Sequence, residues 1–333
     1  MQAAPLAPTI SGPHQKANEQ MSTAFNIHPD FLSIKARPMS LKRWPLAVMT
    51  SLLSTVNALH RRKFKTLIVK ETILSSDGHR APVLIIKPEK LIASAPALVY
   101  YHGGAFVMKP APQHVENAVR YAQEAQCVVI FVEYRLAPKH PFPAGFNDCY
   151  AALRWTISNA SKLGIDQRRV VVGGDSAGGA LAAAVAQKAV HEERIKLCGQ
   201  LLIYPVADAD CKWPSTSAYA DVPPFKAASP LAIWEAYLGQ SPKTGVPRYA
   251  SPIHGDLSGL APAYVELAEF DILHDEGDAY AKALLAKNVE VEVNEIQGTV
   301  HGFDLLAANS GISKAAMQSR IQFLQKVFGR RAS

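Results

Sequence analysis

Cysteine is scarce in this chain, and its spacing gives no sign of a metal or redox motif. The four cysteines form neither a C-x-x-C nor a C-x-x-C-H pattern; they are Cys127, Cys149, Cys198 and Cys211. Two of them, Cys127 and Cys198, lie in or beside apolar runs that are typical of buried strands. We therefore expect reduced core thiols and a cytoplasmic protein. A chain of 333 residues can bury a large core without disulfides or metals.

Charged residues are also few, at 19% of the chain, and the net charge of +7 is unevenly placed. Residues 1–70 contain ten Lys/Arg and two Asp/Glu, which leaves 25 against 26 for residues 71–333. A basic excess raises nucleic acid or anionic membrane as a partner. Because the excess belongs entirely to the N-terminal segment, we expect no nucleic-acid partner, and weak peripheral contact with a membrane stays open.

The chain lacks a hydrophobic run long enough for a membrane span. The residues before position 21 have no basic start followed by an apolar stretch, so we expect a frayed terminus and no secretory signal. The most apolar run, Trp44–Leu59, is about one residue short of the minimum span and is interrupted by polar residues.

Within this run, helical spacing places Leu46, Met49, Leu53 and Val56 on one side, and Thr50, Ser51, Ser54 and Asn57 on the other. This pattern predicts an amphipathic helix packed on the protein, with a membrane-surface helix as the rival because Lys and Arg flank it.

From residue 64 onward, short apolar runs alternate with helical patterns. The expected strands are Phe64–Leu74, Pro82–Lys87, Ala97–Tyr101, Cys127–Tyr134, Arg169–Gly173, Leu197–Tyr204, Ala263–Phe270 and Val289–Ile296. The expected helices are 114–125, 144–163, 177–193, 275–287 and 313–328, with one further piece at Pro230–Leu238. Such alternation predicts an α/β fold with a mainly parallel sheet covered on both faces. We expect a catalytic domain of residues 63–204 and 256–333, with a cap formed by residues 1–62 and by an insertion, 205–255.

One segment passes directly from an expected strand into an expected helix through Gly-Asp-Ser-Ala-Gly, residues 174–178. This is the context of the G-x-S-x-G elbow, in which a sharp turn lifts the serine hydroxyl above the sheet edge. Gly174 and Gly178 would leave room for the chain to double back. Ser176 also begins a helix, so the free N–H of Ala177 favours negative charge beside it. A Gly/Ser turn without catalysis is the alternative interpretation.

A second small-residue loop follows an apolar strand at Tyr100-Tyr-His-Gly-Gly-Ala-Phe. Such a loop can direct several backbone N–H groups toward one point, as a developing oxyanion requires. An ordinary glycine turn is the alternative.

Several blocks together resemble the hormone-sensitive lipase family of α/β-hydrolase-fold carboxylesterases. They are His-Gly-Gly-Ala-Phe at 102–106, Glu-Tyr-Arg-Leu-Ala-Pro at 133–138 with His-Pro-Phe-Pro-Ala at 140–144, Gly-Asp-Ser-Ala-Gly-Gly at 174–179, Asp-Ile-Leu-His-Asp-Glu-Gly at 271–277, and His-Gly-Phe at 301–303. The resemblance implies an α/β-hydrolase fold with an eight-stranded sheet and a helical cap. It also implies hydrolysis of short-to-medium acyl esters without a metal or organic cofactor.

A nucleophilic serine needs a base and an orienting acid, in the chain order Ser, acid, His. Only His301 follows the last expected strand, whereas His102 is better explained as a residue that fixes its loop. Asp271 closes the strand Ala263–Phe270; Asp275 and Asp304 are rivals on spacing, although Asp275 is better placed to brace the loop. The resemblance implies Asp271 as the acid, Ser176 as the nucleophile and His301 as the general base and acid.

The resemblance implies Gly104, Ala105 and Ala177 as the oxyanion donors, through their backbone N–H groups. Ala105 departs from the family pattern, which has a third glycine, and alanine is accommodated without strain only if its φ is negative. Lys139 and Ile272 are further departures, and they concern substrate preference and loop geometry. Aromatic and leucine side chains that could line the pocket are Phe106, Trp213, Phe225, Trp234 and Leu238.

Two other functions stay open. One is a receptor on the same fold without catalysis, although such a protein is expected to lack a triad member. The other is a lactonase or amidase that uses the same triad. The partner that we expect is a small-molecule ester, with a homodimer also compatible with the family resemblance.

Overall fold

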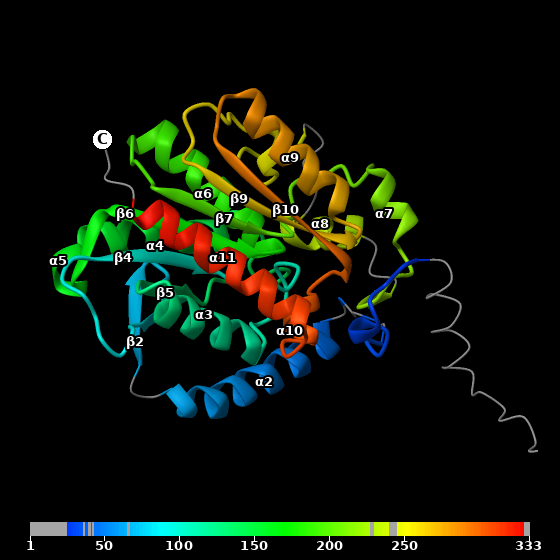
Figure 1. Cartoon of the computed structure of the whole chain (residues 1–333), viewed down its shortest axis with the longest axis horizontal. Coiled ribbons are helices and arrows are strands. Elements are labelled where there is room, and N and C mark those ends of the chain that lie inside the picture. Colours follow the sequence, from blue (N-terminus) through cyan, green and yellow to red (C-terminus); the bar gives the residue numbers. More distant parts are fainter. Residues whose placement is uncertain are drawn as a thin grey trace, which may run out of the picture.

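An eight-stranded sheet forms the centre of the molecule in the computed structural model (Figure 1). The structure describes residues 25–329 except 36, 39, 40, 42, 65, 66, 227–229 and 240–244. The strands run in the order β10-β9-β7-β6-β4-β5-β3-β2. Their bounds are β2 Ile68–Leu74, β3 Arg80–Ile86, β4 Ala95–Tyr101, β5 Val128–Val132, β6 Ile165–Asp175, β7 Gly199–Ile203, β9 Ala263–Phe270 and β10 Val291–Val300.

The sheet is parallel from β10 to β5, and only its far edge is antiparallel. Strand β3 runs antiparallel to β5, and β2 runs antiparallel to β3. The central strands β4, β5 and β7 are buried along their whole length, as expected of strands covered on both faces. The mainly parallel, eight-stranded sheet that the sequence predicts is confirmed.

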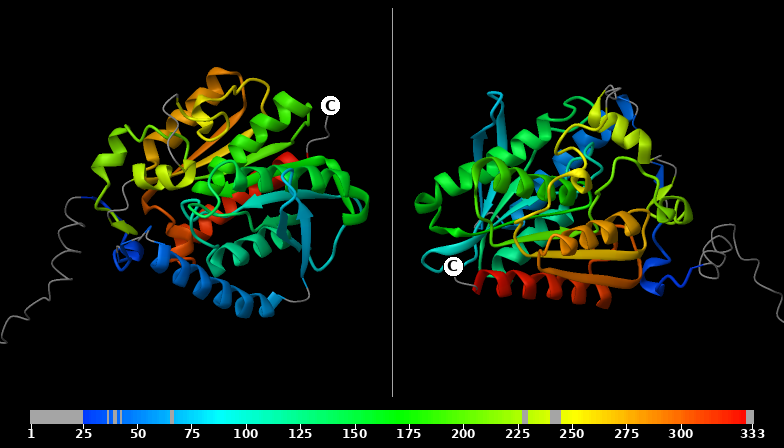
Figure 2. Two further views of the ribbon diagram at one scale, coloured as in Figure 1. Left: turned by 180° about the vertical axis from the view of Figure 1, so that it is seen from behind. Right: turned by 90° about the horizontal axis from the view of Figure 1, so that it is seen from above.

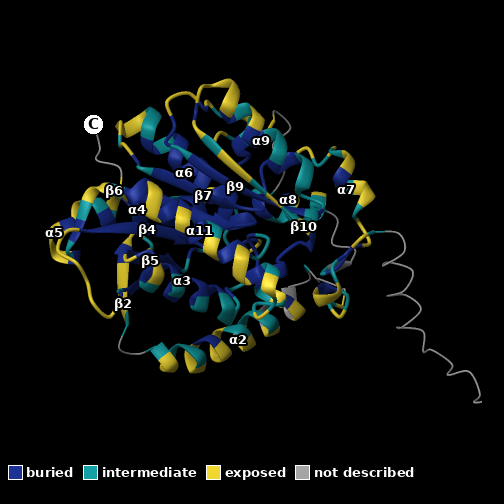
Figure 3. Cartoon of the chain, in the orientation of Figure 1, coloured by how far each residue is buried: buried dark blue, intermediate teal, exposed yellow. Residues whose placement is uncertain are grey.

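Helices cover both faces of the sheet (Figure 2, right). On one face, α3 (Pro112–Glu124) and α11 (Gly311–Gly329) pack over the side chains of Tyr100, Phe131 and Tyr264. On the other face lie α4 (Ala144–Ser158), α6 (Ala177–Glu193) and α9 (His274–Ala286). The short helices α5 (Ala160–Leu163) and α10 (Phe303–Leu306) follow α4 and β10. Figure 3 shows the sheet as the buried centre between these helices.

Two segments that are far apart in the sequence meet beside the sheet. The strand β1 (Arg37–Pro38) pairs in parallel with β8 (Phe225–Lys226). The ring of Phe25 also lies 5.6 Å from the rings of Tyr219 and Phe270. The N-terminal segment contributes η1 (Pro29–Phe31), α2 (Arg43–His60) and η2 (Arg61–Phe64), and the insertion contributes α7 (Pro214–Ala218), α8 (Pro230–Leu238) and η3 (Pro252–His254).

Helix α2 has nearly the predicted bounds, but the predicted division of its faces is partly wrong. Leu46 is 6% exposed and faces inward, as expected, whereas Val56 is 39% exposed and Asn57 is only 2% exposed. Asn57 donates a hydrogen bond from Nδ2 to the carbonyl oxygen of Pro110 at 2.5 Å. At the end of the helix, His60 Nε2 lies 2.8 Å from Glu116 Oε1. These polar contacts orient the helix, and apolar spacing alone could not predict them.

Two other elements differ from the sequence-based prediction. The expected helix 144–163 is divided at Asn159, whose φ of −106° and ψ of 17° leave the helical region. Helix α7 has only five residues and was not predicted. Short helices lack the apolar periodicity on which such predictions rest.

The four cysteines are free, and Cys127 and Cys149 are buried. None of the described helices combines the length and the apolar character that a bilayer crossing requires. Residues 1–24 and parts of the expected cap insertion lie outside the described residues.

Candidate active site

Ser176 lies at the junction of β6 and α6 in a backbone conformation that few residues adopt. Its φ is 54° and its ψ is −119°, a region that costs about 1–3 kcal/mol outside glycine. Two glycines make the turn possible. A Cβ on Gly174 would lie 2.4 Å from the carbonyl oxygen of Tyr101, and one on Gly178 would lie 1.9 Å from the same oxygen. The serine is thus held at the end of the central strand by a close approach of α6 to β4.

His301 and Asp271 meet Ser176 at the carboxyl end of the sheet. His301 follows β10, and its Nε2 lies 3.0 Å from Ser176 Oγ. Its Nδ1 lies 2.6 Å from Oδ2 of Asp271, which directly follows β9. The Leu273 N–H donates to the other Asp271 oxygen at 3.0 Å. All three side chains are buried, with residue exposures of 8% for Ser176, 7% for His301 and 1% for Asp271. The arrangement lets His301 accept the serine proton while Asp271 fixes the imidazole tautomer.

Neither rival acid contacts His301 in this way. Asp275 accepts a hydrogen bond from the Ser215 N–H at 2.9 Å and so braces α7. Asp304 accepts hydrogen bonds from Tyr204 Oη at 2.5 Å and from Arg320 at 2.6 Å. These two carboxylates are engaged with other groups, whereas Asp271 Oδ2 lies 2.6 Å from the imidazole Nδ1.

The surroundings of His301 favour its protonated form. Burial alone would lower the pKa of His301, but the charge of Asp271 and its hydrogen bond raise the pKa above the ordinary 6.5, with smaller help from Asp175 and Asp304. A raised pKa makes the imidazole a stronger base and stabilises the imidazolium that forms when the serine proton is taken.

The loop after β4 brings Gly104 and Ala105 beside the serine turn. Gly104 has a φ of 122°, and Ala105 has a φ of 54°. The condition for an unstrained alanine is therefore not met, and the loop carries local backbone strain at Ala105. Both Ala105 and Ser176 line the same pocket. The N–H of Ala177, at the first position of α6, has no partner within the helix.

Asp175 connects the serine turn to this loop, and the motif analysis did not single it out. Its carboxylate accepts hydrogen bonds from the Gly103 N–H at 3.0 Å and from Tyr100 Oη at 2.8 Å, and it lies 3.0 Å from His114 Nε2. Burial would raise the pKa of Asp175, but His114, Tyr100 and His102 lower it to about 2. Burial would lower the pKa of His114, and Asp175 raises it above 6.5. Asp175 could have been noticed in the sequence, because it ends an expected strand and directly precedes Ser176. No sequence pattern singles out His114.

His102 is buried in the loop after β4. Its ring stacks on Tyr134 at 4.5 Å, and its Nδ1 lies 2.7 Å from the Gly103 carbonyl oxygen. Burial and the nearby His114 lower the pKa of His102 to about 3, so the ring is neutral at physiological pH. These contacts support the predicted part in fixing the loop.

A small apolar pocket opens above Ser176. Its volume is about 50 Å³, and its lining consists of Ala105, Phe106, Ser176, Val206, Cys211, Thr216, Pro230, Ile233, Trp234, Ile272, Leu273, Glu276 and His301. Phe106 and Trp234 were among the five candidate lining residues. Trp213 and Leu238 are not in this lining, and the side chain of Phe225 lies outside the described residues.

Among the described residues that line this pocket, Glu276 is the acidic one. Burial raises its pKa to about 8, against the lowering effect of hydrogen bonds from the Ala207 and Asp208 N–H groups. The carboxyl group is therefore mostly neutral at pH 7, and the pocket suits an uncharged group.

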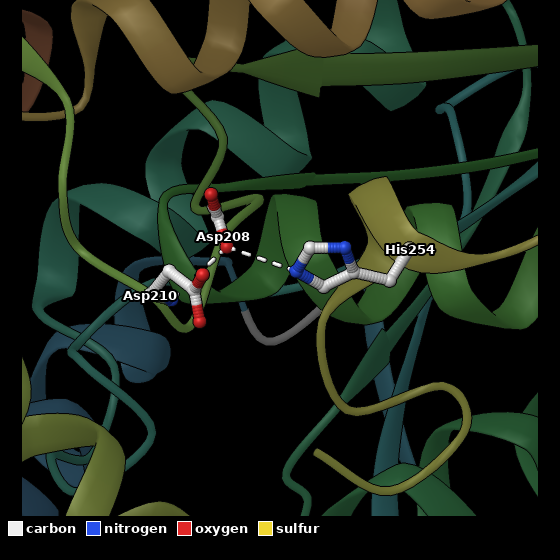
Figure 4. A group of neighbouring side chains, drawn as sticks. All are labelled: Asp208, Asp210 and His254. Carbon is white, nitrogen blue, oxygen red and sulfur yellow. Dashed lines mark hydrogen bonds and ion pairs between the residues drawn. The ribbon is translucent and has the colours of Figure 1, made fainter. Parts of the chain in front are cut away.

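Asp208, Asp210 and His254 place carboxylate and imidazole atoms within 4.8 Å of one another (Figure 4). Oxygen and nitrogen ligands of this kind could hold a divalent cation. In this structure Asp208 binds protein groups instead. Its Oδ1 accepts from the Asp210 N–H at 3.0 Å and lies 3.1 Å from His254 Nε2, and its Oδ2 accepts from the Trp213 indole at 2.9 Å. These contacts fasten the insertion near β7.

Comparison with protein families matches residues 98–305 to a family described by the α/β hydrolase fold. Among named proteins, carboxylesterase NlhH of Mycobacterium tuberculosis is 40% identical over 239 residues, which are 71% of this chain and 75% of the relative. Ethyl acetate hydrolase of Pseudomonas putida is 38% identical over 237 residues, which are 70% and 74% of the two chains.

Solved structures are similar over a larger part of the chain. A bacterial heroin esterase has a TM-score of 0.81 at 30% identity and covers 91% of this chain and 98% of its own. Esterase LipW from Mycobacterium marinum has a TM-score of 0.83 at 28% identity, with coverages of 91% and 96%.

Proposed function

This chain belongs to the α/β-hydrolase-fold family, in its hormone-sensitive-lipase-like branch, and we propose that it is a serine carboxylesterase for short-to-medium acyl esters. The relatives with 40% and 38% identity are named a carboxylesterase and an ethyl acetate hydrolase, which supports carboxylic ester hydrolysis. The observation that carries the residue assignment is the contact chain from Ser176 Oγ to His301 at 3.0 Å and from His301 to Asp271 at 2.6 Å.

In the proposed reaction, His301 removes the hydroxyl proton of Ser176 as Oγ attacks the ester carbonyl. Asp271 holds the Nδ1 proton and stabilises the charged imidazolium. His301 then gives its proton to the departing alcohol, which leaves an acyl group on Ser176. A water molecule, deprotonated by the same imidazole, attacks the acyl carbonyl, and the acid and the free serine are released.

The proposed oxyanion donors are the N–H groups of Gly104, Ala105 and Ala177. These groups stabilise the negative charge that develops on the former carbonyl oxygen. Removal of one such donor lowers kcat about 10²–10³-fold. The dipole of α6 acts in the same direction, because Ala177 begins this helix of 17 residues.

The pocket supports a preference for short acyl groups. Its apolar lining and its volume of about 50 Å³ leave little room for a long chain. Ile233 and Trp234 belong to α8, so the insertion supplies part of the wall. We propose that residues 1–62 and 205–255 form a discontinuous cap, which is supported by the pairing of β1 with β8.

We also propose a cytoplasmic location, which the four free cysteines support.

A series of p-nitrophenyl esters from acetate to laurate tests this proposal. We expect the highest kcat/KM for acetate or butyrate and a steep fall for longer chains.

A serine variant tests the residue assignment. Ser176→Ala should lower kcat at least about 10⁴-fold and should leave the fold unchanged. Ser319→Ala, on the exposed side of α11, is the matched control and should keep full activity. Turnover by Ser176→Ala at the wild-type rate would refute the triad.

The same assay separates the alternatives. A catalytically inactive receptor would bind esters without turnover, and an amidase or lactonase would prefer anilides or lactones over esters of equal acyl length. The presence of all three side chains in contact supports catalysis over the receptor.

A further inference from the structure

Helix α2 exposes a row of large apolar side chains to solvent. Val48 is 67% exposed, Leu52 63% and Leu59 55%, and Val56 at their edge is 39% exposed. At 3.6 residues per turn, Val48, Leu52 and Leu59 lie within about 40° of one another around the helix axis. We call these four residues the outer face of α2. Single exposed leucines are ordinary, but a continuous apolar row on one helix indicates an interaction surface.

The orientation of α2 is fixed by its polar contacts, so the outer face cannot turn inward without breaking them. Asn57 donates to the Pro110 carbonyl, and His60 lies 2.8 Å from Glu116. Arg61, in the turn after the helix, forms an ion pair with Glu133 at 2.5 Å. Leu46 is packed into the core behind these contacts. Apolar side chains therefore occupy more of the circumference of α2 than the rest of the protein covers.

The charge near the outer face is mainly positive, although Glu116 and Glu133 lie at the end of the helix, paired with His60 and Arg61. No acidic residue occurs between Asp30 and Glu71, while this stretch contains nine Lys or Arg residues. Arg62 and Lys63 are exposed directly after the helix. Arg80, Lys109 and Lys139 line a cavity of about 910 Å³ together with Glu133; Leu46 and Thr50, on the side of α2 opposite the outer face, also line it. No described carboxylate forms an ion pair with any of these five cations.

We propose that the outer face of α2 docks on an anionic lipid surface. Apolar side chains flanked by cations are the pattern of a helix that lies in the membrane interface, where the apolar row enters the headgroup boundary and the cations contact lipid phosphates. The helix has 18 residues and does not have the apolar character of a span.

A second copy of this chain fits the surface less well. A twofold dimer through α2 would bring the same face of both copies together. Arg62 and Lys63 of one copy would then face a surface that is basic as well, and like charges across an interface are unfavourable. An anionic surface satisfies the apolar row and the cations at once.

Flotation of the full-length protein with phospholipid vesicles tests the proposal. We expect binding to vesicles that contain phosphatidylglycerol, at least about tenfold weaker binding to vesicles of phosphatidylcholine alone, and a strong loss when salt shortens the Debye length to about 3 Å. Equal binding to both vesicle types, or no binding to either, would overturn it.

Matched variants identify the surface. Leu52→Ser with Leu59→Ser should weaken binding at least about tenfold, whereas Leu285→Ser, on α9 and 50% exposed, should not. Arg62→Gln with Lys63→Gln should cost roughly fivefold per removed cation, and Lys287→Gln with Lys314→Gln should cost little. Hydrolysis of a water-soluble ester should be unchanged in all four.

Two further measurements on the unbound protein complete the test. Sedimentation velocity should give the same species for wild type and Leu52→Ser with Leu59→Ser. A dimer that the serine variant dissociates would show a second copy as the occupant and overturn the lipid proposal. A large fall in the melting temperature of the same variant, absent in Leu285→Ser, would show that the face is covered in the free protein and would also overturn it.

Discussion

At the scale of single residues, the proposed triad lies beside a buried carboxylate with several polar partners. Asp175 receives hydrogen bonds from Gly103 and Tyr100 and pairs with His114. It precedes Ser176 in the chain, so one carboxylate joins the serine turn to the loop that carries Gly104 and Ala105. We infer that Asp175 positions the oxyanion donors relative to the nucleophile.

Replacing Asp175 with Asn should reduce kcat far more than it changes KM. The variant loses the ion pair with His114, and the loop after β4 can then shift; a displacement of about 1 Å can cost about 10²-fold in rate. Asp166→Asn, near the start of β6 and far along the strand from Ser176, where the carboxylate pairs with Arg168 and Arg169, is the control and should leave kcat unchanged. Steady-state kinetics at a temperature where both variants are folded measure the effect. Wild-type kcat in Asp175→Asn would contradict the positioning role.

The pH dependence of activity should follow His301. The general base must be neutral, and Asp271 holds the pKa of His301 above 6.5. Activity should therefore be full at pH values above this raised pKa and should fall about tenfold per pH unit below it. In Asp271→Asn, burial would act without the opposing charge, so the acid limb should move to lower pH while kcat drops by about 10⁴. An acid limb of the wild-type enzyme centred below about pH 6 would disagree with this assignment.

At the scale of elements, close backbone approach determines where Ser176 lies. Helix α6 packs against the end of β4 without any side chain between Gly178 and Tyr101. Only glycine allows this approach, because a Cβ at position 178 would lie 1.9 Å from a backbone oxygen. The glycines of the elbow are thus a packing requirement of the helix and strand as well as of the turn.

Gly178→Ala should therefore separate α6 from β4 and remove most activity, with a loss of stability of about 3 kcal/mol or more, as for overpacking against a backbone that cannot move. Gly311→Ala is a matched control, because a Cβ there meets no atom within 4 Å. Urea unfolding and ester turnover of both variants give the comparison. If Gly178→Ala were as stable and active as Gly311→Ala, the packing argument would be wrong.

The elements also show what the sequence could and could not predict. All eight strands of the main sheet were placed, because the central ones are short apolar runs bounded by turn residues, while the edge strands β2 and β10 mix apolar with charged residues. The order of Ser176, Asp271 and His301 followed from motifs at strand ends. The outer face of α2 was not predicted, since its orientation is set by long-range contacts such as Asn57 with Pro110. The positive φ of Ala105 was also not predictable, because the loop imposes it.

At the scale of the whole molecule, a buried charge network joins distant parts of the chain behind the site. Arg320 of α11 is 0% exposed and pairs with Glu266 of β9 and with Asp304 of α10. Asp304 also accepts from Tyr204, whose ring lies 5.0 Å from that of His301. The C-terminal helix is thereby connected to the loop that presents the histidine.

Arg320→Met should destabilise the protein by about 3–5 kcal/mol, because Glu266 and Asp304 would remain buried without their countercharge. Lys326→Met, on the same helix but 48% exposed at its side chain, should change the free energy of unfolding by less than about 1 kcal/mol. Urea denaturation of the two variants measures the difference. Equal stability of both variants would mean that the network contributes nothing to the fold.

The central claim is that Ser176 forms a covalent acyl-enzyme, and covalent labelling tests it most directly. An organophosphate such as diethyl p-nitrophenyl phosphate transfers its phosphoryl group to an activated serine and releases p-nitrophenol. Intact-mass measurement should show one adduct per chain, peptide mapping should locate it on Ser176, and Ser176→Ala should remain unlabelled. An adduct on another residue, or equal labelling of Ser176→Ala, would contradict the assignment.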